Sequence, residues 1–263
     1  MEKHESRRYP SVKAASNEDR INMVKDIFAT ITGKYDFLNH LLSLRRDVAW
    51  RRRAVGAMRF FRTRRLLDVA TGTGDLAIEA ALVHPDIQVV GMDFVGEMMD
   101  MAREKIACKN LSGRIGLVQA DALRIPAADN SFDAAAIAFG IRNIPERLAA
   151  LKEMARVVVP GGRVLVLEMT FPRSVFFQKI YDIYLNRLLP RLARAFSPNP
   201  AAYEYLADSI MNFPTAPQFA RLMEQAGLKD IEMHPLTFGV AWLHVGHKPQ
   251  MPSRPDREDH KRG

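Results

Sequence analysis

Short apolar strands alternate with helices between residues 65 and 168, and this alternation constrains the fold more strongly than any other feature of the sequence. Runs rich in Val, Ile, Leu and Phe predict strands over residues 65–70, 87–92, 115–119, 132–138 and 163–168. The spacing of apolar residues predicts helices over 76–83, 97–109 and 147–157, and Pro160-Gly161-Gly162 predicts a break before the fifth strand. Strands that alternate with helices form mostly parallel sheets with helices on both faces, so the sequence predicts an α/β fold.

Further helices and two more strands flank this core. Apolar spacing predicts helices from residue 17, over 37–44 and over 48–61 upstream, and over 174–196, 203–211 and 215–225 downstream. Strands over 228–233 and 237–246 are predicted to close one edge of the sheet as a hairpin, with Pro235 in their connection. The predicted sheet therefore has seven strands, with a helical extension before it and a helical insertion before the last two strands.

The length of 263 residues favours one α/β domain with added helices over two domains. Residues 1–16 and 249–263 contain too few apolar side chains to offset the entropy of ordering, so we expect flexible tails there. The single domain between them, residues 17–248, divides into a helical cap (17–62), a ligand-binding core (63–170) and a helical region with the closing strands (171–248).

Charge and composition narrow the classes of partner. A net charge of +8 fits a nucleic acid, an anionic membrane or an acidic ligand. Because Lys and Arg are scattered and no RNA-binding signature occurs, a nucleic acid is disfavoured. No apolar run reaches about 18 residues, and residues 1–16 lack an apolar signal core. The single cysteine, Cys108, excludes an internal disulfide, which suits the cytoplasm.

The turn after the first predicted strand carries the strongest local motif, Asp68-Val69-Ala70-Thr71-Gly72-Thr73-Gly74-Asp75. A dinucleotide fingerprint requires a third glycine where this chain has Ala77, and the acid Asp75 would repel a pyrophosphate. S-adenosylmethionine carries a cationic sulfonium and an ammonium group, so Asp68 and Asp75 would attract it. Alternatively, Asp75 only caps the helix.

Acids also follow the second and third predicted strands. Asp93 can accept hydrogen bonds from both hydroxyls of a ribose, and Asp121 can accept one from an adenine amino group. A single Asp at a strand end is usually a turn residue. Three acids at successive strand ends instead favour a nucleoside site, because ligands of open parallel sheets bind there.

The full order of motifs resembles one family. It comprises the glycine turn with Asp68, Asp93 after strand two, Asp121-Ala122 after strand three, Phe139-Gly140-Ile141-Arg142-Asn143 after strand four, Pro160-Gly161-Gly162, Tyr35-Asp36-Phe37-Leu38-Asn39 upstream, and residues 203–210 with Phe213-Pro214 downstream. This pattern resembles the ubiquinone/menaquinone biosynthesis C-methyltransferases, the UbiE/MenG family, over residues 26–247. Two departures are Asp47, where many members carry His, and Ala138, which lacks a hydroxyl present in some members.

The resemblance implies a class I S-adenosylmethionine-dependent methyltransferase fold, which is Rossmann-like, and a quinol acceptor. The implied acceptor is demethylmenaquinol, with 2-methoxy-6-polyprenyl-1,4-benzoquinol as a second candidate; another phenolic or lipid-like acceptor is the alternative. The residues that this reading assigns to the cofactor are Asp68, Gly72, Thr73, Gly74, Asp93, Asp121, Ala122 and Ala138.

Methylation of a ring carbon requires a group that stabilises the quinolate, and Arg142 is the expected cation or the group that orients a water molecule. Asn143, Tyr35 and Asp36 are expected to line the quinol pocket, with Asp36 as a candidate base. Arg142 could instead form a structural salt bridge, and Tyr35 could simply pack. The histidines have no metal-ligand spacing, so no metal is expected.

Aromatic and cationic residues mix in the segment 173–196. Such a segment could lie on an anionic membrane surface and admit an isoprenoid tail, which would place the protein on the inner face of the cytoplasmic membrane. It could equally pack on the core or form a homodimer contact.

Overall fold

The computed structural model describes residues 19, 22–27, 40, 43, 45–170 and 201–250. The predicted helix over 174–196, most of the predicted helix over 37–44, and the site candidates Tyr35 and Asp36 lie outside these residues. In the described part of the chain, no helix is both long enough and apolar enough to cross a bilayer.

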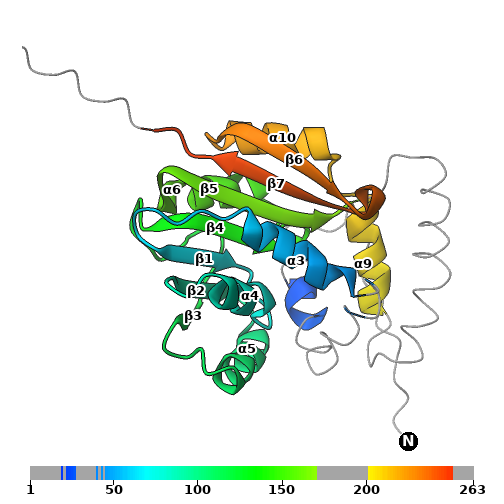
Figure 1. Ribbon diagram of the computed structural model, residues 1–263. Helices are drawn as coiled ribbons and strands as arrows, with labels where there is room; N and C mark the ends of the chain where they lie inside the picture. The colour runs from blue at the N-terminus through cyan, green and yellow to red at the C-terminus, as the bar shows by residue number, and fades with distance from the viewer. Residues whose placement is uncertain are drawn as a thin grey trace, which may run out of the picture.

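A seven-stranded sheet forms the centre of the molecule, with strand order β3-β2-β1-β4-β5-β7-β6 (Figure 1). The strands are β1 (Arg65–Val69), β2 (Gln88–Asp93), β3 (Ile115–Gln119), β4 (Phe132–Ala138), β5 (Val158–Met169), β6 (Lys229–Leu236) and β7 (Ala241–His247). Strands β1 to β5 pair in parallel, whereas β7 runs antiparallel to both β5 and β6. The predicted mostly parallel sheet and its closing hairpin are confirmed.

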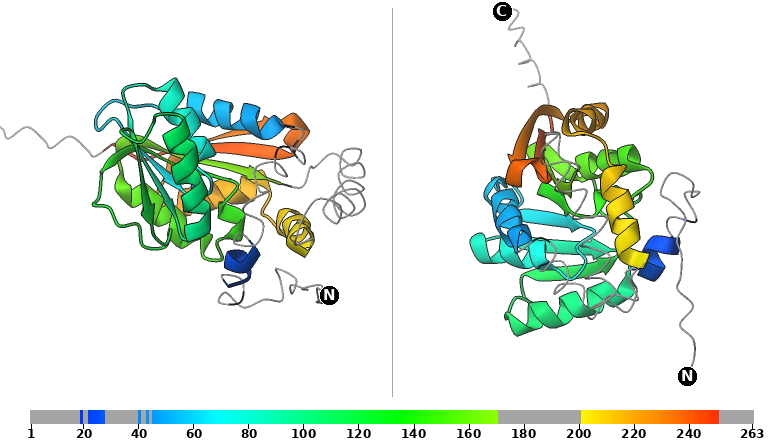
Figure 2. Two further views of the ribbon diagram at one scale, coloured as in Figure 1. Left: turned by 90° about the horizontal axis from the view of Figure 1, so that it is seen from below. Right: turned by 90° about the vertical axis from the view of Figure 1, so that its right-hand side faces the viewer.

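Helices cover both faces of the sheet, because successive strand residues point to opposite sides. Leu66 packs with α3 (Arg46–Gly56), α4 (Asp75–Val83) and α5 (Gly96–Cys108). Its neighbour Leu67 packs with α6 (Arg147–Val157) and α10 (Ala216–Gln225) on the other face. Figure 2 shows these two helical layers on either side of the sheet. The helix α9 (Ala201–Met211) lies beside the carboxyl ends of the strands, next to the 3-10 turn η2 (Ile141–Asn143).

Several predicted boundaries were wrong. The predicted strand over 237–246 begins only at Ala241, because Thr237–Gly239 forms a 3-10 turn before it. Strand β5 begins at Val158, because Pro160-Gly161-Gly162 forms an irregularity within the strand and not a break before it. A Cβ on Gly162 would lie 2.5 Å from the carbonyl oxygen of Asp133, so the β4 and β5 backbones approach closely there. Pro235 lies inside β6, which tolerates it as an edge strand. Helix α3 ends at Gly56, earlier than predicted.

Candidate cofactor and substrate site

A cavity of about 220 Å³ opens at the carboxyl ends of β1, β2 and β4. The strand order reverses between β1 and β4, and ligands of open α/β sheets bind at such a reversal. The predicted residues that line the cavity are Gly72, Asp93, Asp121, Ala122, Ala138 and Asn143. The cavity also reaches Val24 and Lys25 of the N-terminal helical segment, so the helical cap contributes to its wall.

The turn after β1 has a backbone that favours glycine. Gly72 and Gly74 have φ angles of 55° and 83°, in the left-handed region where other residues are strained. Gly74 also lies against α5, since a Cβ there would be 3.3 Å from the Cβ of Ala102. The turn can therefore bring its backbone N–H groups close to a ligand.

Asp93 ends β2 and faces the cavity. Its carboxylate accepts hydrogen bonds from the backbone N–H groups of Gly72 (2.8 Å) and Val95 (3.0 Å). Burial raises the pKa of Asp93, although these backbone donors oppose the shift. A carboxylate can accept about four hydrogen bonds, so the same oxygens have capacity for two hydroxyl donors.

Asp121 and Ala122 follow β3 at the other end of the cavity. Asp121 is exposed, and its Oδ1 accepts a hydrogen bond from the N–H of Leu123 at 2.9 Å. The same cavity is lined by apolar side chains, namely Val95, Met98 and Leu123, as well as by Asp93 and Asp121. An acid beside an apolar slot suits a nucleoside, whose ribose is polar and whose base is flat and apolar on its faces.

Asp68 is close to the turn but lies beneath it. Its Oδ2 accepts hydrogen bonds from Thr71 Oγ1 (2.6 Å) and from the N–H of Ala77 (3.1 Å). The side chain is 1% exposed, and burial raises the pKa of Asp68 to about 7. Asp68 therefore holds the turn and the first turn of α4 together, and it is not among the residues that line the cavity.

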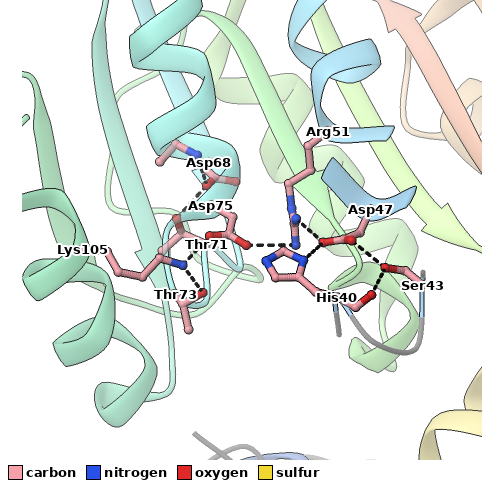
Figure 3. A network of polar contacts seen from close by, with 10 residues as sticks. His40, Ser43, Asp47, Arg51, Asp68, Thr71, Thr73, Asp75 and Lys105 are labelled. Carbon is pink, nitrogen blue, oxygen red and sulfur yellow. Dashed lines mark hydrogen bonds and ion pairs between the residues drawn. The ribbon is translucent and has the colours of Figure 1, made fainter. Parts of the chain in front are cut away.

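Asp75, Thr73 and two cations form a network behind the same turn (Figure 3). Lys105 of α5 pairs with Asp75 and also donates to Thr73 Oγ1 at 3.1 Å. Arg51 of α3 lies 3.2 Å from the other carboxylate oxygen of Asp75. Because both of its oxygens face cations of the protein, Asp75 does not offer an unopposed charge to a sulfonium.

Asp47 anchors the α3 side of this network. Its carboxylate accepts hydrogen bonds from Ser43 Oγ (2.5 Å) and Arg51 Nη1 (2.6 Å), and it lies 2.8 Å from Nδ1 of His40. Burial opposes the charge of Asp47, but the Ser43 hydrogen bond and the Arg51 charge outweigh it and hold the pKa below its usual value.

Arg142 and Asn143 lie in η2, directly after β4. The Arg142 guanidinium pairs with Glu168 of β5 (2.5 Å) and donates to the carbonyl of Phe139 (2.7 Å). Arg142 and Glu168 are 5% and 1% exposed, so the salt bridge that was the alternative reading of Arg142 exists and is buried. Asn143 lines the cavity, and Tyr205 of α9 donates to its side-chain oxygen at 3.2 Å.

Comparison with known proteins identifies the family. The model of the ubiE/COQ5 methyltransferase family matches residues 13–248. The chain belongs to the ubiE/COQ5 methyltransferase family. The predicted methyltransferase activity and its cofactor, S-adenosylmethionine, are thereby confirmed.

Two relatives and one solved structure illustrate the similarity. The chain is 44% identical to the ubiquinone/menaquinone biosynthesis C-methyltransferase UbiE of Geotalea daltonii, over 86% of this chain and 96% of the relative. It is 43% identical to a demethylmenaquinone methyltransferase of Deinococcus radiodurans, over 88% and 95%. A SAM-dependent methyltransferase from Thermotoga maritima shares the fold, with a TM-score of 0.58, 19% identity and coverage of 85% and 98%.

The residues of this ubiE/COQ5 family member fit S-adenosylmethionine. Asp93 presents acceptors for a ribose, the apolar slot suits adenine, and Gly72 has no side chain to fill the cavity beside Asp93. No group of three metal-binding side chains occurs among the residues that the structure describes.

Sequence reasoning missed several residues that shape this ubiE/COQ5 site. Glu168, Arg51 and Lys105 each pair with a motif residue, and Phe139, which was noted only as part of the motif after strand four, lines the cavity with a φ of 59°. Among the three pairing residues, Glu168 gave a signal, since an acid at the end of the apolar run 164–167 needs a partner when it is buried. The other contacts join segments far apart in sequence.

Proposed function

We propose that the chain transfers a methyl group from S-adenosylmethionine to a ring carbon of a polyprenylated quinol, with demethylmenaquinol as the principal acceptor. The second candidate is 2-methoxy-6-polyprenyl-1,4-benzoquinol, because one relative carries a name that covers both ubiquinone and menaquinone biosynthesis. Another phenolic or lipid-like acceptor is the alternative, and the family relationship does not favour it.

One observation carries this proposal: the cavity continues from Asp93 past the β1–β4 reversal to Asn143, Ile144 and Pro145. The part near Asp93 suits the nucleoside of the cofactor. The part near Asn143 offers one polar side chain among apolar ones, which suits a ring that carries hydroxyl groups. A cofactor and an aromatic acceptor can thus meet in one space.

Bound S-adenosylmethionine supplies an electrophilic methyl group on a sulfonium. A quinol that loses a phenolic proton has an electron-rich ring carbon, so the protein needs no covalent nucleophile. The side chains need to bind both molecules, align them and exclude water. Met98, Phe139 and Ile144 supply apolar walls for this purpose.

Arg142 and Asn143 are the groups that we assign to the acceptor. Tyr205 orients the amide of Asn143, and Glu168 with the Phe139 carbonyl fixes the guanidinium of Arg142. Arg142 is not among the residues that line the cavity, and Glu168 offsets part of its charge, so we assign Arg142 a role in holding its neighbour Asn143 in place. Tyr35 and Asp36, which lie outside the described residues, remain the other candidates for the quinol pocket on the family motif, with Asp36 as the candidate base.

Peripheral contact with the inner face of the cytoplasmic membrane is also part of the proposal. Its support is the net charge of +8 and the isoprenoid tail of the proposed acceptor. Sedimentation with vesicles tests it: binding to vesicles with an anionic lipid and no binding to purely zwitterionic vesicles is the expected result. Equal recovery in the supernatant with both vesicles would contradict it.

The acceptor is tested by incubating the purified chain with labelled S-adenosylmethionine and a reduced demethylmenaquinone or a reduced demethylated benzoquinone analogue. The product is measured by mass, and the corresponding oxidised quinones serve as controls. We expect methylated product from the naphthoquinol and none from either quinone. Cofactor binding without product from either quinol would contradict the quinol assignment.

A further inference from the structure

The guanidinium of Arg51 contacts three separate parts of the molecule. Its Nη1 donates to Asp47 of the same helix at 2.6 Å, and its Nη2 lies 3.2 Å from Asp75 at the start of α4. Its central carbon lies 5.6 Å from the centroid of the Phe139 ring, which follows β4. Figure 3 shows Arg51 reaching from α3 toward Asp75 and Asp47.

Two of these contacts, with Asp75 and with Phe139, are made to residues in or next to the loops that line the cavity. Asp75 is the next residue after Gly74, so its position sets where the glycine turn enters α4. Phe139 and Gly72 line the cavity, whereas Arg51 and Asp75 do not. Arg51 thus contacts the segments that follow β1 and β4 without lining the cavity itself.

The Phe139 loop needs such support because its backbone is strained. Phe139 has a φ of 59°, which a residue with a side chain adopts only where its surroundings hold it there. The Trp50 ring, with its centroid 6.1 Å from that of Phe139, contacts it from the same helix as Arg51. Helix α3 therefore packs two of its side chains against this loop.

Burial strengthens the interaction of Arg51 with Asp47. Arg51 is 9% exposed and Asp47 is 3% exposed, so solvent screens their interaction much less than it screens a surface pair. A planar guanidinium can hold two carboxylates at once in a fixed geometry, which an ammonium group cannot reproduce. Among the residues that the structure describes, removal of Arg51 leaves Lys105 as the cation that pairs with Asp75, and it removes the link between the turn and α3.

We propose that Arg51 is a positioning residue of the cofactor site, which couples α3 to the glycine turn through Asp75 and to the β4 loop through Phe139. This inference rests on the proposed function, in that S-adenosylmethionine occupies the cavity. Arg51 is not among the residues that line the cavity, so we assign its effect to Asp75 and Phe139.

The chain offers a matched control on the same helix. Arg52 also joins α3 to α4, through a 3.0 Å ion pair with Glu79, but its side chain is 67% exposed. Arg51→Gln and Arg52→Gln remove the same charge from neighbouring positions of one interface. Only the first removes a contact to the glycine turn.

The experiment measures the dissociation constants of S-adenosylmethionine and S-adenosylhomocysteine by calorimetry, with circular dichroism to verify that each variant is folded. Arg51→Gln is expected to weaken both ligands about 10-fold, whereas Arg52→Gln should change them less than about 2-fold. Arg51→Lys should recover only part of the loss. In the enzyme assay, the KM for the cofactor should rise more than kcat falls.

A second variant keeps the test decisive if Arg51→Gln does not fold. Asp75→Asn removes the partner at the turn but leaves the Arg51–Asp47 pair, and it should weaken cofactor binding in the same direction. A folded Arg51→Gln variant, or failing that a folded Asp75→Asn variant, with unchanged affinity would overturn the inference alone. Absence of cofactor binding by the unchanged chain would instead overturn the proposed function, and this inference with it.

Discussion

Asp68 and Asp93 lie near the ends of neighbouring strands, yet their carboxylates have different surroundings. Asp93 faces the cavity and accepts two backbone N–H groups, whereas Asp68 is buried beneath the turn with Thr71 and Ala77. Burial raises the pKa of both, to about 7 for Asp68. One acid is therefore available to a ligand, and the other supports the turn.

The titration of Asp68 gives a prediction for stability. Its pKa rises from 3.8 to about 7 on folding, so the folded state holds a proton that the unfolded state has released between these values. This contribution to stability is complete below pH 3.8 and is lost as the pH rises through about 7. Asp68→Asn keeps the shape of the side chain and does not titrate. As the pH rises from 4 to 8, the free energy of unfolding of the unchanged chain should therefore fall relative to that of the variant.

Urea unfolding at several pH values measures this difference. Asp100→Asn is the matched control, because it makes the same substitution at a side chain that is 72% exposed on α5. The difference in the free energy of unfolding between variant and unchanged chain should depend on pH much more strongly for Asp68→Asn than for the control. Equal pH dependence of the two differences would contradict the prediction.

Asp93 gives a prediction for cofactor affinity. Asp93→Asn leaves one acceptor oxygen where two backbone N–H groups and the ribose hydroxyls all require acceptors. We expect S-adenosylmethionine to bind about 10- to 100-fold more weakly, measured by calorimetry. Asp121→Asn keeps an acceptor for an adenine amino group and should lose less than about 3-fold. Similar losses for both variants would refute the division of roles between them.

Which residues belong to the site was largely predictable, but what their side chains contact was not. Asp93, Asp121, Gly72 and Asn143 line the cavity because strand ends are readable from apolar runs. The surroundings of Asp75 were not readable, because they are set by Arg51, which is distant in sequence and lies on another helix.

At the scale of elements, β1 and β4 approach so closely that one glycine is required between their ends. A Cβ on Gly140 would lie 2.7 Å from the Cβ of Ala70, which has a φ of 52° and lines the cavity. Gly140 itself has an ordinary φ of −108°, so the requirement is one of space.

Gly140→Ala should therefore lower both stability and cofactor affinity. We expect the free energy of unfolding to fall by about 1–3 kcal/mol, as for other insertions of a methyl group into a packed site. Gly116→Ala in β3 is the control, since nothing lies within 4 Å of its added Cβ, and it should not lower the free energy of unfolding, because alanine is favoured over glycine within a strand. Denaturant unfolding and calorimetry measure the two effects, and equal stability of the two variants would argue against the close approach.

The elements of the core were predictable because β3, β4 and α6 follow their apolar patterns. The irregularity at Pro160-Gly161-Gly162 was not, because such residues usually end an element. Here the strand continues because Val158 pairs with β4 and because Gly161 and Gly162 form backbone hydrogen bonds with Lys248. Pro235 was misplaced for a similar reason, since only the strand order reveals that β6 is an edge.

At the scale of the whole molecule, the two helical layers are joined to the sheet by buried polar groups as well as by apolar packing. His244 of β7 is 1% exposed, lies 3.0 Å from the carbonyl oxygen of Ala216 in α10, and packs against the Phe219 ring. On the opposite face, Trp50 of α3 donates to Thr237 Oγ1 at 2.9 Å, beside the start of β7. The closing hairpin is thus tied to both layers.

His244 should make the fold sensitive to acid. Burial lowers the pKa of His244 from 6.5 to about 4, so its contribution to stability is complete above pH 6.5 and is lost as the pH falls through about 4. His244→Gln can still donate to the Ala216 carbonyl but does not titrate. Between pH 7 and pH 4, its thermal midpoint should fall less than that of the unchanged chain; an equal or larger fall would exclude His244 as a cause.

The position of β7 has a consequence for how the protein is made. β7 is the last of the described strands in sequence, yet it lies between β5 and β6 and pairs with both. During synthesis, the apolar edge of β5 stays unpaired until the ribosome has produced α9, α10, β6 and finally β7. A ribosome that stalls before β7 leaves a nascent chain with an open, aggregation-prone sheet edge, so completion of the fold waits for the final strand to emerge.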